Sequence, residues 1–366
     1  MITKLELENF TTFEQLSIDF SPGINVIIGE NGTGKTQLLK AAYALATTSA
    51  QNKEIEEGEI ENTFTEKFNR IFMPEEMKIG KLSRCKDTKC ASIEGSFLED
   101  YSHDKNIKFQ LSTRVKSLKL ENKTDGNLYG MEPIFIPTKE VLSLYKGLAT
   151  HPEHKEAFET IFDDTYFDLC KQLARDTTEG HEARIQTFLE EIVNKIQGRF
   201  EFDGASVAFN AGIYKKYVGK DDTYFDATPE ETLSTQMVAE GFRKLGVLHR
   251  LIDNSTLVPK KSGSLFWDEP ESNMNPKLMK LIVEILLELS RREQQIILTT
   301  HEYILLKWLD LLSTEHDAIR YHILYREEGV IKIRSVDKYT LIDKNAIDDT
   351  FSDIYDADLK RTLGDF

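Results

Sequence analysis

The 366-residue sequence predicts an α/β fold with a mixed, mostly parallel core sheet, an inserted antiparallel β subdomain and an inserted helical lobe. Residues 24–28 form a short apolar run rich in β-branched residues, as in strands buried on both faces of a sheet. A glycine-rich turn follows, and from Lys35 to about Ala50 apolar residues recur at helical spacing. Later segments keep alternating between strand and helix, which favours a parallel sheet covered by helices.

Each element is expected from its own pattern, in which alternation indicates a strand and three-to-four spacing a helix. In order, these are strands on either side of the turn at 9–14, the strand at 24–28, the helix at 35–50, an acidic loop or exposed helix at 51–61, antiparallel strands within 91–97 and 107–120, a core strand at 133–137, helices within 139–197, strands within 200–217, a strand at 265–267, a helix near 277–290, a strand at 295–298, a further helix, and strands around Ile319 and Ile331.

The composition is that of an ordinary globular protein, with 40% hydrophobic and 30% charged residues. The longest apolar stretch, Leu281 to Leu289, is interrupted by Glu284 and Glu288, whereas a membrane-spanning helix needs roughly 20 apolar residues. Three cysteines argue against a disulfide framework and favour a reducing compartment. We therefore expect a cytoplasmic protein that does not enter a membrane.

The charge is unevenly distributed. The net charge of −16 disfavours a general affinity for nucleic acid. Between Lys78 and Lys123, however, 11 Lys and Arg stand against 6 Asp and Glu. This basic strip suits contact with phosphate or an acidic partner, although a solvated face of exposed strands is the commoner role of such a run.

The glycine-rich turn has the pattern of a phosphate-binding loop. Gly29 is followed by four variable residues and then by Gly34-Lys35-Thr36, between a strand and a helix. The loop N–H groups and the start of the helix suit an anion, Lys35 suits the β- and γ-phosphates, and the Thr36 hydroxyl suits magnesium. The residues expected to bind ATP are Glu30, Asn31, Gly32, Thr33, Gly34, Lys35, Thr36 and Gln37.

An acidic pair and a histidine complete the expected hydrolytic site. The apolar strand Leu265-Phe266-Trp267 ends in Asp268-Glu269. We expect Asp268 to bind Mg²⁺ with Thr36, and Glu269 to orient or deprotonate the attacking water. His301 follows the next core strand and is expected beside the γ-phosphate. Lys35, Glu269 and His301 are therefore the predicted catalytic residues.

The phosphate loop, the acidic pair and the His301 strand, in this order, resemble the ABC ATPase superfamily. Asn9 to Phe13, Phe135-Ile136-Pro137, Val238 to Lys244 and Asp268-Glu269-Pro270-Glu271 are similar to its soluble AAA/OLD-like branch. That branch includes the ATPases of anti-phage systems such as Septu and PARIS and is related to SMC and RecF proteins. The resemblance implies a P-loop ABC ATPase head that uses ATP and Mg²⁺.

Laid onto this plan, residues 1–366 form a single ATPase domain in discontinuous lobes. Residues 1–50 and 129–138 supply the N-terminal part of the ATPase core, and 51–128 supply the acidic loop and the antiparallel β insertion. Residues 139–200 are the helical insertion. Residues 201–366 carry the signature segment, the acidic pair, the histidine and the C-terminal strands.

The resemblance also implies a head-to-tail homodimer in which a signature segment closes the nucleotide of the opposite subunit. Ala239, Glu240, Gly241 and Arg243 match that segment, with Ala239 where serine is usual. The sequence Leu233-Ser234-Thr235-Gln236 is closer to the usual signature in residue identity, but it lacks the glycine. In the loop after the acidic pair, 272–276, the usual aspartate is absent, which weakens the expected communication between the two sites.

Several assignments stay open at the level of sequence. Lys139 or Glu140 replaces the family's glutamine, and Phe10 and Phe13 are candidates for stacking on adenine, although aromatics in such a hairpin more often belong to the core. Two minor metal hypotheses are a zinc site and a histidine pair. Their residues are Cys85, Cys90, His103 and Cys170 for zinc, and His151 with His154 for the pair.

The expected function is an ATP-gated dimerisation switch. By resemblance, its setting is anti-phage defence, with a separate effector, a nuclease among the candidates. The alternative is an SMC/RecF-like repair ATPase that binds DNA through the strip Lys78–Lys123. The ATPase subunit of a membrane transporter is disfavoured, because the helical insertion is large and the signature segment diverges.

Overall fold

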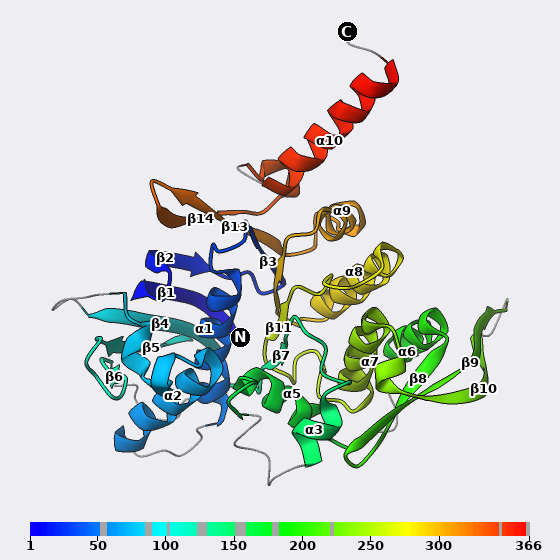
Figure 1. Ribbon diagram of the computed structural model, residues 1–366, viewed down its shortest axis with the longest axis horizontal. Coiled ribbons are helices and arrows are strands. Elements are labelled where there is room, and N and C mark those ends of the chain that lie inside the picture. Colours follow the sequence, from blue (N-terminus) through cyan, green and yellow to red (C-terminus); the bar gives the residue numbers. More distant parts are fainter. Residues whose placement is uncertain are drawn as a thin grey trace.

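A six-stranded mixed sheet lies at the centre of the computed structural model (Figure 1), which describes residues 1–51, 57–84, 90–100, 103–122, 130–150, 159–177, 183–219, 223–343 and 346–363. Its strand order is β14-β13-β3-β12-β11-β7, and all neighbours are parallel except β13 and β14. The strands are β3 (Ile24–Gly29), β7 (Ile134–Ile136), β11 (Leu265–Asp268), β12 (Ile296–Thr300), β13 (Ile319–Glu327) and β14 (Val330–Val336). The predicted α/β fold with a mixed core sheet is confirmed.

Alternate residues of the central strands enter two separate hydrophobic cores. In β11, Leu265 and Trp267 belong to one core, while Phe266 between them belongs to the other. Residues of β12 divide in the same way, with Ile297 facing opposite to Ile296 and Leu298. A strand buried on both faces reads as a continuous apolar run, which is why these strands were recognisable in the sequence.

Helices cover both faces of this sheet. On one face, α1 (Lys35–Gln51) packs beside α2 (Glu57–Phe72) in the core that contains Phe266. On the other face lie α7 (Glu240–Asp253), α8 (Pro276–Arg291) and α9 (Tyr303–Leu312). The carboxyl ends of β3, β11 and β12 therefore open between helices from distant parts of the chain, where ligands of such sheets bind.

The expected β insertion joins the N-terminal hairpin in one antiparallel sheet of order β2-β1-β4-β5-β6. Its strands are β1 (Ile2–Phe10), β2 (Phe13–Asp19), β4 (Ala91–Asp100), β5 (His103–Leu111) and β6 (Lys119–Leu120). Leu7 is paired with Leu16 on one side and Ile93 on the other. Alternation alone does not reveal which strand an inserted strand will pair with, so this junction was not predicted.

The segment expected to be helical contains α3 (Tyr145–Thr150), α5 (Asp164–Leu173) and α6 (Ala183–Ile196). It is followed by a three-stranded sheet of β8 (Gly198–Asp203), β9 (Ser206–Val218) and β10 (Thr223–Ser234). The strand β10 was missed, because Pro229 and the acidic residues around it obscure the alternation. The hairpin β9–β10 extends to the side of the molecule opposite β4–β6 (Figure 1).

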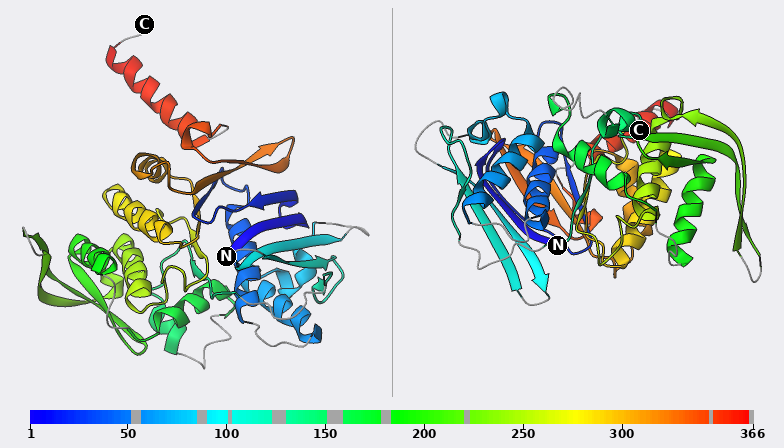
Figure 2. Two further views of the ribbon diagram at one scale, coloured as in Figure 1. Left: turned by 180° about the vertical axis from the view of Figure 1, so that it is seen from behind. Right: turned by 90° about the horizontal axis from the view of Figure 1, so that it is seen from below.

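The C-terminal helix α10 (Ala346–Leu363) extends away from the body (Figures 1 and 2). Phe351 near its start stacks on Tyr303 of α9 with ring centroids 4.2 Å apart. Short 3₁₀ turns occur at Glu75–Met77, Ile79–Leu82, Thr235–Met237 and Tyr339–Leu341. Of the helices in the described ranges, none combines the length and apolar character that crossing a membrane requires. The acidic segment 51–61 includes the start of α2, and 52–56 lie outside the described residues.

Candidate nucleotide site

The phosphate-loop sequence connects β3 to α1, as the pattern predicts. Lys35 is buried, and its Nζ donates to the carbonyl oxygens of Gly29 at 2.7 Å and Glu30 at 3.3 Å. Burial lowers the pKa of Lys35, while the carboxylates of Glu269, Asp268 and Glu271 oppose that effect. The ammonium therefore lies inside the curl of the loop, close to the acidic pair.

Gly34 is required because the loop lies directly on the N-terminal hairpin. Its φ is +90°, and a Cβ there would come 2.6 Å from Thr12 Cγ2 and 2.7 Å from Phe13 Cζ. Phe10 and Phe13 are themselves completely buried in the core. Phe13 lies directly against Gly34 of the loop, and neither aromatic is accessible to an adenine ring, so their candidacy as stacking residues was wrong.

Three threonine hydroxyls converge on Asp268. Thr36 Oγ1 lies 3.1 Å from Oδ1 and 3.0 Å from Oδ2, Thr138 Oγ1 lies 2.7 Å from Oδ2, and Thr299 Oγ1 lies 2.7 Å from Oδ1. Thr36 and Asp268 are thus brought together across 232 positions. A hydroxyl and a carboxylate at this separation are oxygen donors that suit Mg²⁺, which takes few protein ligands and otherwise binds water and phosphate oxygens.

The backbone of Glu269 is in the left-handed region, with φ +47°, which is uncommon for a residue other than glycine. It is held from two sides. Its N–H donates to Thr299 Oγ1 at 3.0 Å, and its carbonyl accepts from Lys244 Nζ at 3.3 Å. Its carboxylate Oε1 lies 3.4 Å from His301 Nδ1. The two residues predicted to act at the γ-phosphate are therefore adjacent.

Glu271 fixes the start of the segment that contains His301. Its Oε1 accepts from Thr300 Oγ1 at 2.7 Å and from the His301 N–H at 3.0 Å. The His301 ring nitrogen Nδ1 also lies 3.5 Å from this oxygen. Burial raises the pKa of Glu271. His301 is thus positioned by a buried carboxyl from the neighbouring strand end.

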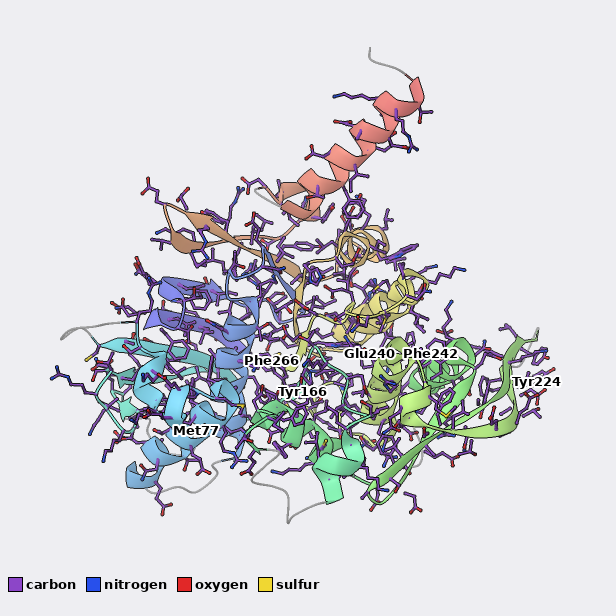
Figure 3. The ribbon with its side chains drawn as sticks, in the orientation of Figure 1. Met77, Tyr166, Tyr224, Glu240, Phe242 and Phe266 are labelled. Atoms are coloured by element: carbon purple, nitrogen blue, oxygen red, sulfur yellow. The ribbon has the colours of Figure 1, made fainter. Side chains whose placement is uncertain are left out.

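The segment matched to the ABC signature opens α7. Ala239 is the N-cap residue and provides no side-chain cap, in keeping with the missing serine hydroxyl, and Glu240 is the first helical residue. Gly241 packs on the loop after the acidic pair, because a Cβ there would lie 3.3 Å from Met274 Cα. Figure 3 shows Glu240 and Phe242 toward the β8–β10 side of Phe266 and Tyr166.

Arg243 is engaged within its own subunit. Its Nη1 donates to the carbonyls of Thr235 at 3.0 Å and Val238 at 2.5 Å, and its Nε lies 3.0 Å from Glu140 Oε1. In the segment after β7, Glu140 is therefore paired with Arg243 of α7, and Thr138 is the residue that reaches Asp268. Tyr166 of α5 accompanies this segment, and burial and the nearby Asp163 and Asp268 carboxylates raise its pKa.

The zinc hypothesis finds no support in the described part of the chain, where no three His, Cys, Asp or Glu side chains form a group fit for a metal. Cys170 lies in the hydrophobic core, where burial raises its pKa to about 12, whereas Cys90 is exposed. Cys85, the side chain of His103 and the residues His151 to His154 lie outside the described residues.

Sequence reasoning missed Thr138, Thr299, Lys244 and the anchoring role of Glu271. Thr299 lies near the carboxyl end of β12, and Thr138 follows β7 by two residues; both strands pair with β11. Polar residues at those ends meet at one edge of a parallel sheet, so this position was the available signal. Lys244 interrupts the apolar face of the amphipathic helix α7 with a charged side chain. That interruption was the available signal.

Two family models match the chain. Residues 1–222 match a model described as an AAA ATPase domain. Residues 224–307 match a second model, described as an AAA domain with the AbiEii toxin of a Type IV TA system in its name.

Among curated proteins, matches include two called DNA replication and repair protein RecF. The protein from Oceanobacillus iheyensis is 35% identical over 115 residues, which cover 29% of this chain and 30% of that protein. The protein from Halalkalibacterium halodurans is 27% identical over 198 residues, covering 50% of this chain and 53% of that protein. The chain thus spans from under a third to about half of the length of these relatives.

A crystal structure of an SmcHead bound to the C-winged helix domain of ScpA has a similar fold. Its TM-score is 0.51 at 15% identity, and the match covers 93% of this chain and 98% of that one. At this identity the likeness concerns the fold alone.

Proposed function

Because the chain belongs to the AAA ATPase domain family, we propose that it hydrolyses ATP and uses binding and hydrolysis to close and reopen a head-to-tail homodimer. The observation that carries the proposal is the convergence of Thr36, the adjacent pair Asp268 and Glu269, and His301, which come from three separate stretches of the chain. Phosphoryl transfer depends mainly on positioning and charge neutralisation, and this set supplies both.

Each side chain has a role in the proposed reaction. The loop N–H groups and Lys35 bind the phosphates. Glu269 orients a water molecule toward the γ-phosphorus and accepts its proton, while the bond from phosphorus to the bridging oxygen breaks and ADP leaves. His301, held by Glu271, contacts the γ-phosphate oxygens. Thr36 and Asp268 would hold Mg²⁺, which neutralises phosphate charge when bound.

Closure would come from the partner subunit. Ala239, Glu240 and Gly241 form the start of a 14-residue helix, and the N–H groups at such a start favour an anion. We assign this segment to the γ-phosphate in the opposite subunit. Arg243 supports the segment from within, through Glu140. These trans contacts give the closed dimer a higher affinity for ATP than the monomer has. ATP then shifts the equilibrium toward the dimer by that difference in affinity.

The Glu269→Gln variant tests the proposal. It should bind ATP and Mg²⁺ without hydrolysing it and should accumulate as a dimer, measured by light scattering after gel filtration. Glu284→Gln makes the same Glu-to-Gln change on the outer face of α8. It serves as the matched control and should behave like the wild type. A Glu269→Gln protein that stays monomeric with ATP, at concentrations where ATP binding is saturated, contradicts the dimer switch.

For the biological setting, the RecF matches favour an ATPase that acts on DNA. The basic strip contributes less than its composition suggests. Among the described residues, Lys78, Lys81, Arg84 and Lys108 pair with nearby glutamates. Arg114, Lys116 and Lys119 are exposed. These three residues, near β6, form the surface we propose for contact with DNA phosphates.

The second candidate is control of a separate effector in anti-phage defence, as in Septu and PARIS. The observation in its favour is the match of residues 224–307 to a model whose name contains a toxin. The Glu269→Gln protein should then be expressed from its native locus and purified as the ATP-bound dimer. It should retain a protein that is encoded by a neighbouring gene. Retention of DNA alone would favour the repair setting.

A further inference from the structure

Helix α7 places a second basic residue directly after Arg243, and this one reaches the catalytic loop. The Lys244 side chain is 1% exposed, and its Nζ donates to the carbonyl oxygens of Ser272 at 2.7 Å and Glu269 at 3.3 Å. Both acceptors belong to the loop that begins with the acidic pair. Lys244 is therefore a direct connection between the signature helix and that loop in the same subunit.

A buried ammonium is costly unless its hydrogen bonds and charge are compensated. Here two carbonyl oxygens accept from it, and the surrounding carboxylates are those of Glu240, Glu271, Glu269 and Asp268. The loop depends on the contact in turn. An apolar side chain at position 244 would remove the donor to the Ser272 carbonyl and would leave the Glu269 carbonyl with the Ser272 N–H alone, at 3.1 Å.

The contact falls where the backbone needs support. Glu269 has φ +47°, a conformation that persists in non-glycine residues when the surroundings impose it. Thr299 accepts from the N–H of this residue, and its carbonyl accepts from Lys244 Nζ and from the Ser272 N–H. Together they set the direction of the Glu269 side chain, whose carboxylate must meet water and His301. Lys244 thus acts on the catalytic carboxylate without touching the reacting atoms.

The other end of the connection is the start of α7. Gly241 lies against the same loop, with a Cβ at that position 3.3 Å from Met274 Cα and 3.5 Å from the Asn273 carbonyl. The first turn of α7 and the loop 269–275 are therefore in contact at two points, Gly241 and Lys244. A displacement of the first turn has a direct route to the backbone of Glu269.

We propose that Lys244 is a positioning residue that couples the catalytic Glu269 of its own subunit to the signature segment that closes the partner's nucleotide site. This inference rests on the proposed head-to-tail dimer. Nucleotide bound by the partner pulls on the first turn of α7, and Lys244 transmits that pull to the carbonyl of Glu269. Hydrolysis at the two sites is then cooperative, although the loop lacks the aspartate usual in the family.

The test compares Lys244→Met and Lys244→Arg with the wild type. Lys244→Met should bind ATP with an affinity within about twofold of wild type, because the lysine donates to the Glu269 and Ser272 carbonyls of the loop after β11. By contrast, kcat should fall by about tenfold or more. The dependence of rate on ATP should change from a Hill coefficient above one to a coefficient of one. Lys244→Arg, which can still donate to both carbonyls, should recover part of the rate and of the cooperativity.

Lys277→Met, at an exposed lysine near the start of α8, is the matched control and should keep both rate and cooperativity. If Lys244→Met fails to fold, Lys244→Gln replaces it, since an amide can donate to one of the two carbonyls, and it should be slower and non-cooperative. Wild-type rate and cooperativity in the folded variant overturn the coupling.

The premise is checked separately with Lys244→Met in the Glu269→Gln background. That double variant should still dimerise with ATP, because closure depends on the signature segment and not on the lysine. Failure of Glu269→Gln alone to dimerise refutes the dimer itself. A dimer that forms normally, with hydrolysis unaffected by Lys244→Met, refutes only the role of Lys244.

Discussion

At the scale of single residues, Asp268 is the point on which the candidate site converges. It accepts from hydroxyls that belong to the start of α1, the segment after β7 and the end of β12. These hydrogen bonds hold both carboxylate oxygens, Oδ1 through Thr36 and Thr299 and Oδ2 through Thr36 and Thr138. Thr138 and Thr299 thus orient the carboxylate that we propose to bind Mg²⁺.

Thr138 should therefore matter for metal use. Replacing it with valine removes a 2.7 Å hydrogen bond to Asp268 while keeping the side-chain shape. We expect Thr138→Val to raise the Mg²⁺ concentration needed for half-maximal ATPase activity by roughly tenfold, the scale seen when a residue supporting a metal ligand is lost. Thr138→Ser, which retains the hydroxyl, is the control. Equal magnesium titrations for valine, serine and wild type would contradict this role.

His322 should make stability depend on pH. It is completely buried in β13, hydrogen-bonded to Asn25 and Ser335, and burial lowers its pKa from 6.5 to about 3. Because the folded pKa lies below the unfolded value, protonation favours the unfolded chain. The stability contributed by neutral His322 is present above about pH 6.5 and is lost as the pH falls from there toward 3, by at most about 1.4 kcal/mol per pH unit.

The corresponding measurement is urea unfolding of wild type and His322→Gln between pH 7.5 and pH 5. The wild type should lose more stability over this range, because glutamine does not titrate. If both proteins lost the same free energy of unfolding between pH 7.5 and pH 5, His322 would not have a lower pKa in the folded state than in the unfolded state.

At the scale of elements, three helices around the phosphate loop are joined by a buried ionic network. Lys67 of α2 contacts Asp164 at 2.8 Å and Asp168 at 2.6 Å, both on α5. Tyr43 of α1 donates to Asp168 at 2.7 Å. The helix that follows the phosphate loop is thus connected to the helical insertion through the hydroxyl of Tyr43 and the carboxylate of Asp168, and the two should move together.

Removing Lys67 should weaken this junction strongly. Lys67→Met removes the ion pair of Asp168 and leaves Asp164 paired with Arg70 alone, at 2.7 Å. Loss of one partner from a buried pair costs about 3 kcal/mol or more. The free energy of unfolding in urea measures the effect. Lys260→Met, which breaks an exposed pair with Glu293, should cost less than about 1 kcal/mol. Similar losses for the two variants would show that burial does not strengthen the network.

The elements also show what the sequence could predict. Strands such as β11 and β12 were recognisable because both of their faces are buried. The phosphate loop was recognisable because its residue pattern lies between a predicted strand and a predicted helix. The pairing of β4 with β1 was not accessible, since the residues of β4 alternate equally well beside any strand. Likewise Glu140 and Arg243 were each noticed, but their ion pair depends on how α7 packs and not on spacing along the chain.

At the scale of the whole molecule, the central sheet separates two cores and gathers the site at its carboxyl edge, while two extensions lie on opposite sides. One is the β4–β6 region with Arg114, Lys116 and Lys119, and the other is the β9–β10 hairpin, with Tyr224 near its end (Figure 3). The hairpin leads directly through the turn at 235–237 to α7.

DNA binding, if the RecF-like setting holds, should depend on the first of these extensions. Reversing Arg114, Lys116 and Lys119 to glutamate should abolish ATP-dependent, salt-sensitive binding to duplex DNA in a fluorescence anisotropy titration, because exposed cations release counterions from phosphate. Reversing Lys78 and Lys81, which are already paired with Glu76 and Glu75, should have a much smaller effect. Unchanged affinity in the triple variant would exclude this surface as the DNA contact.

The order of strands in the central sheet has a consequence for biosynthesis. The strand β3, which ends in the phosphate loop, has β12 on one side and β13 on the other, and both neighbours leave the ribosome long after the loop does. A nascent chain consequently lacks the framework that holds Lys35 and Asp268 together until most of its residues have been translated. Products of interrupted translation should therefore be unable to bind nucleotide.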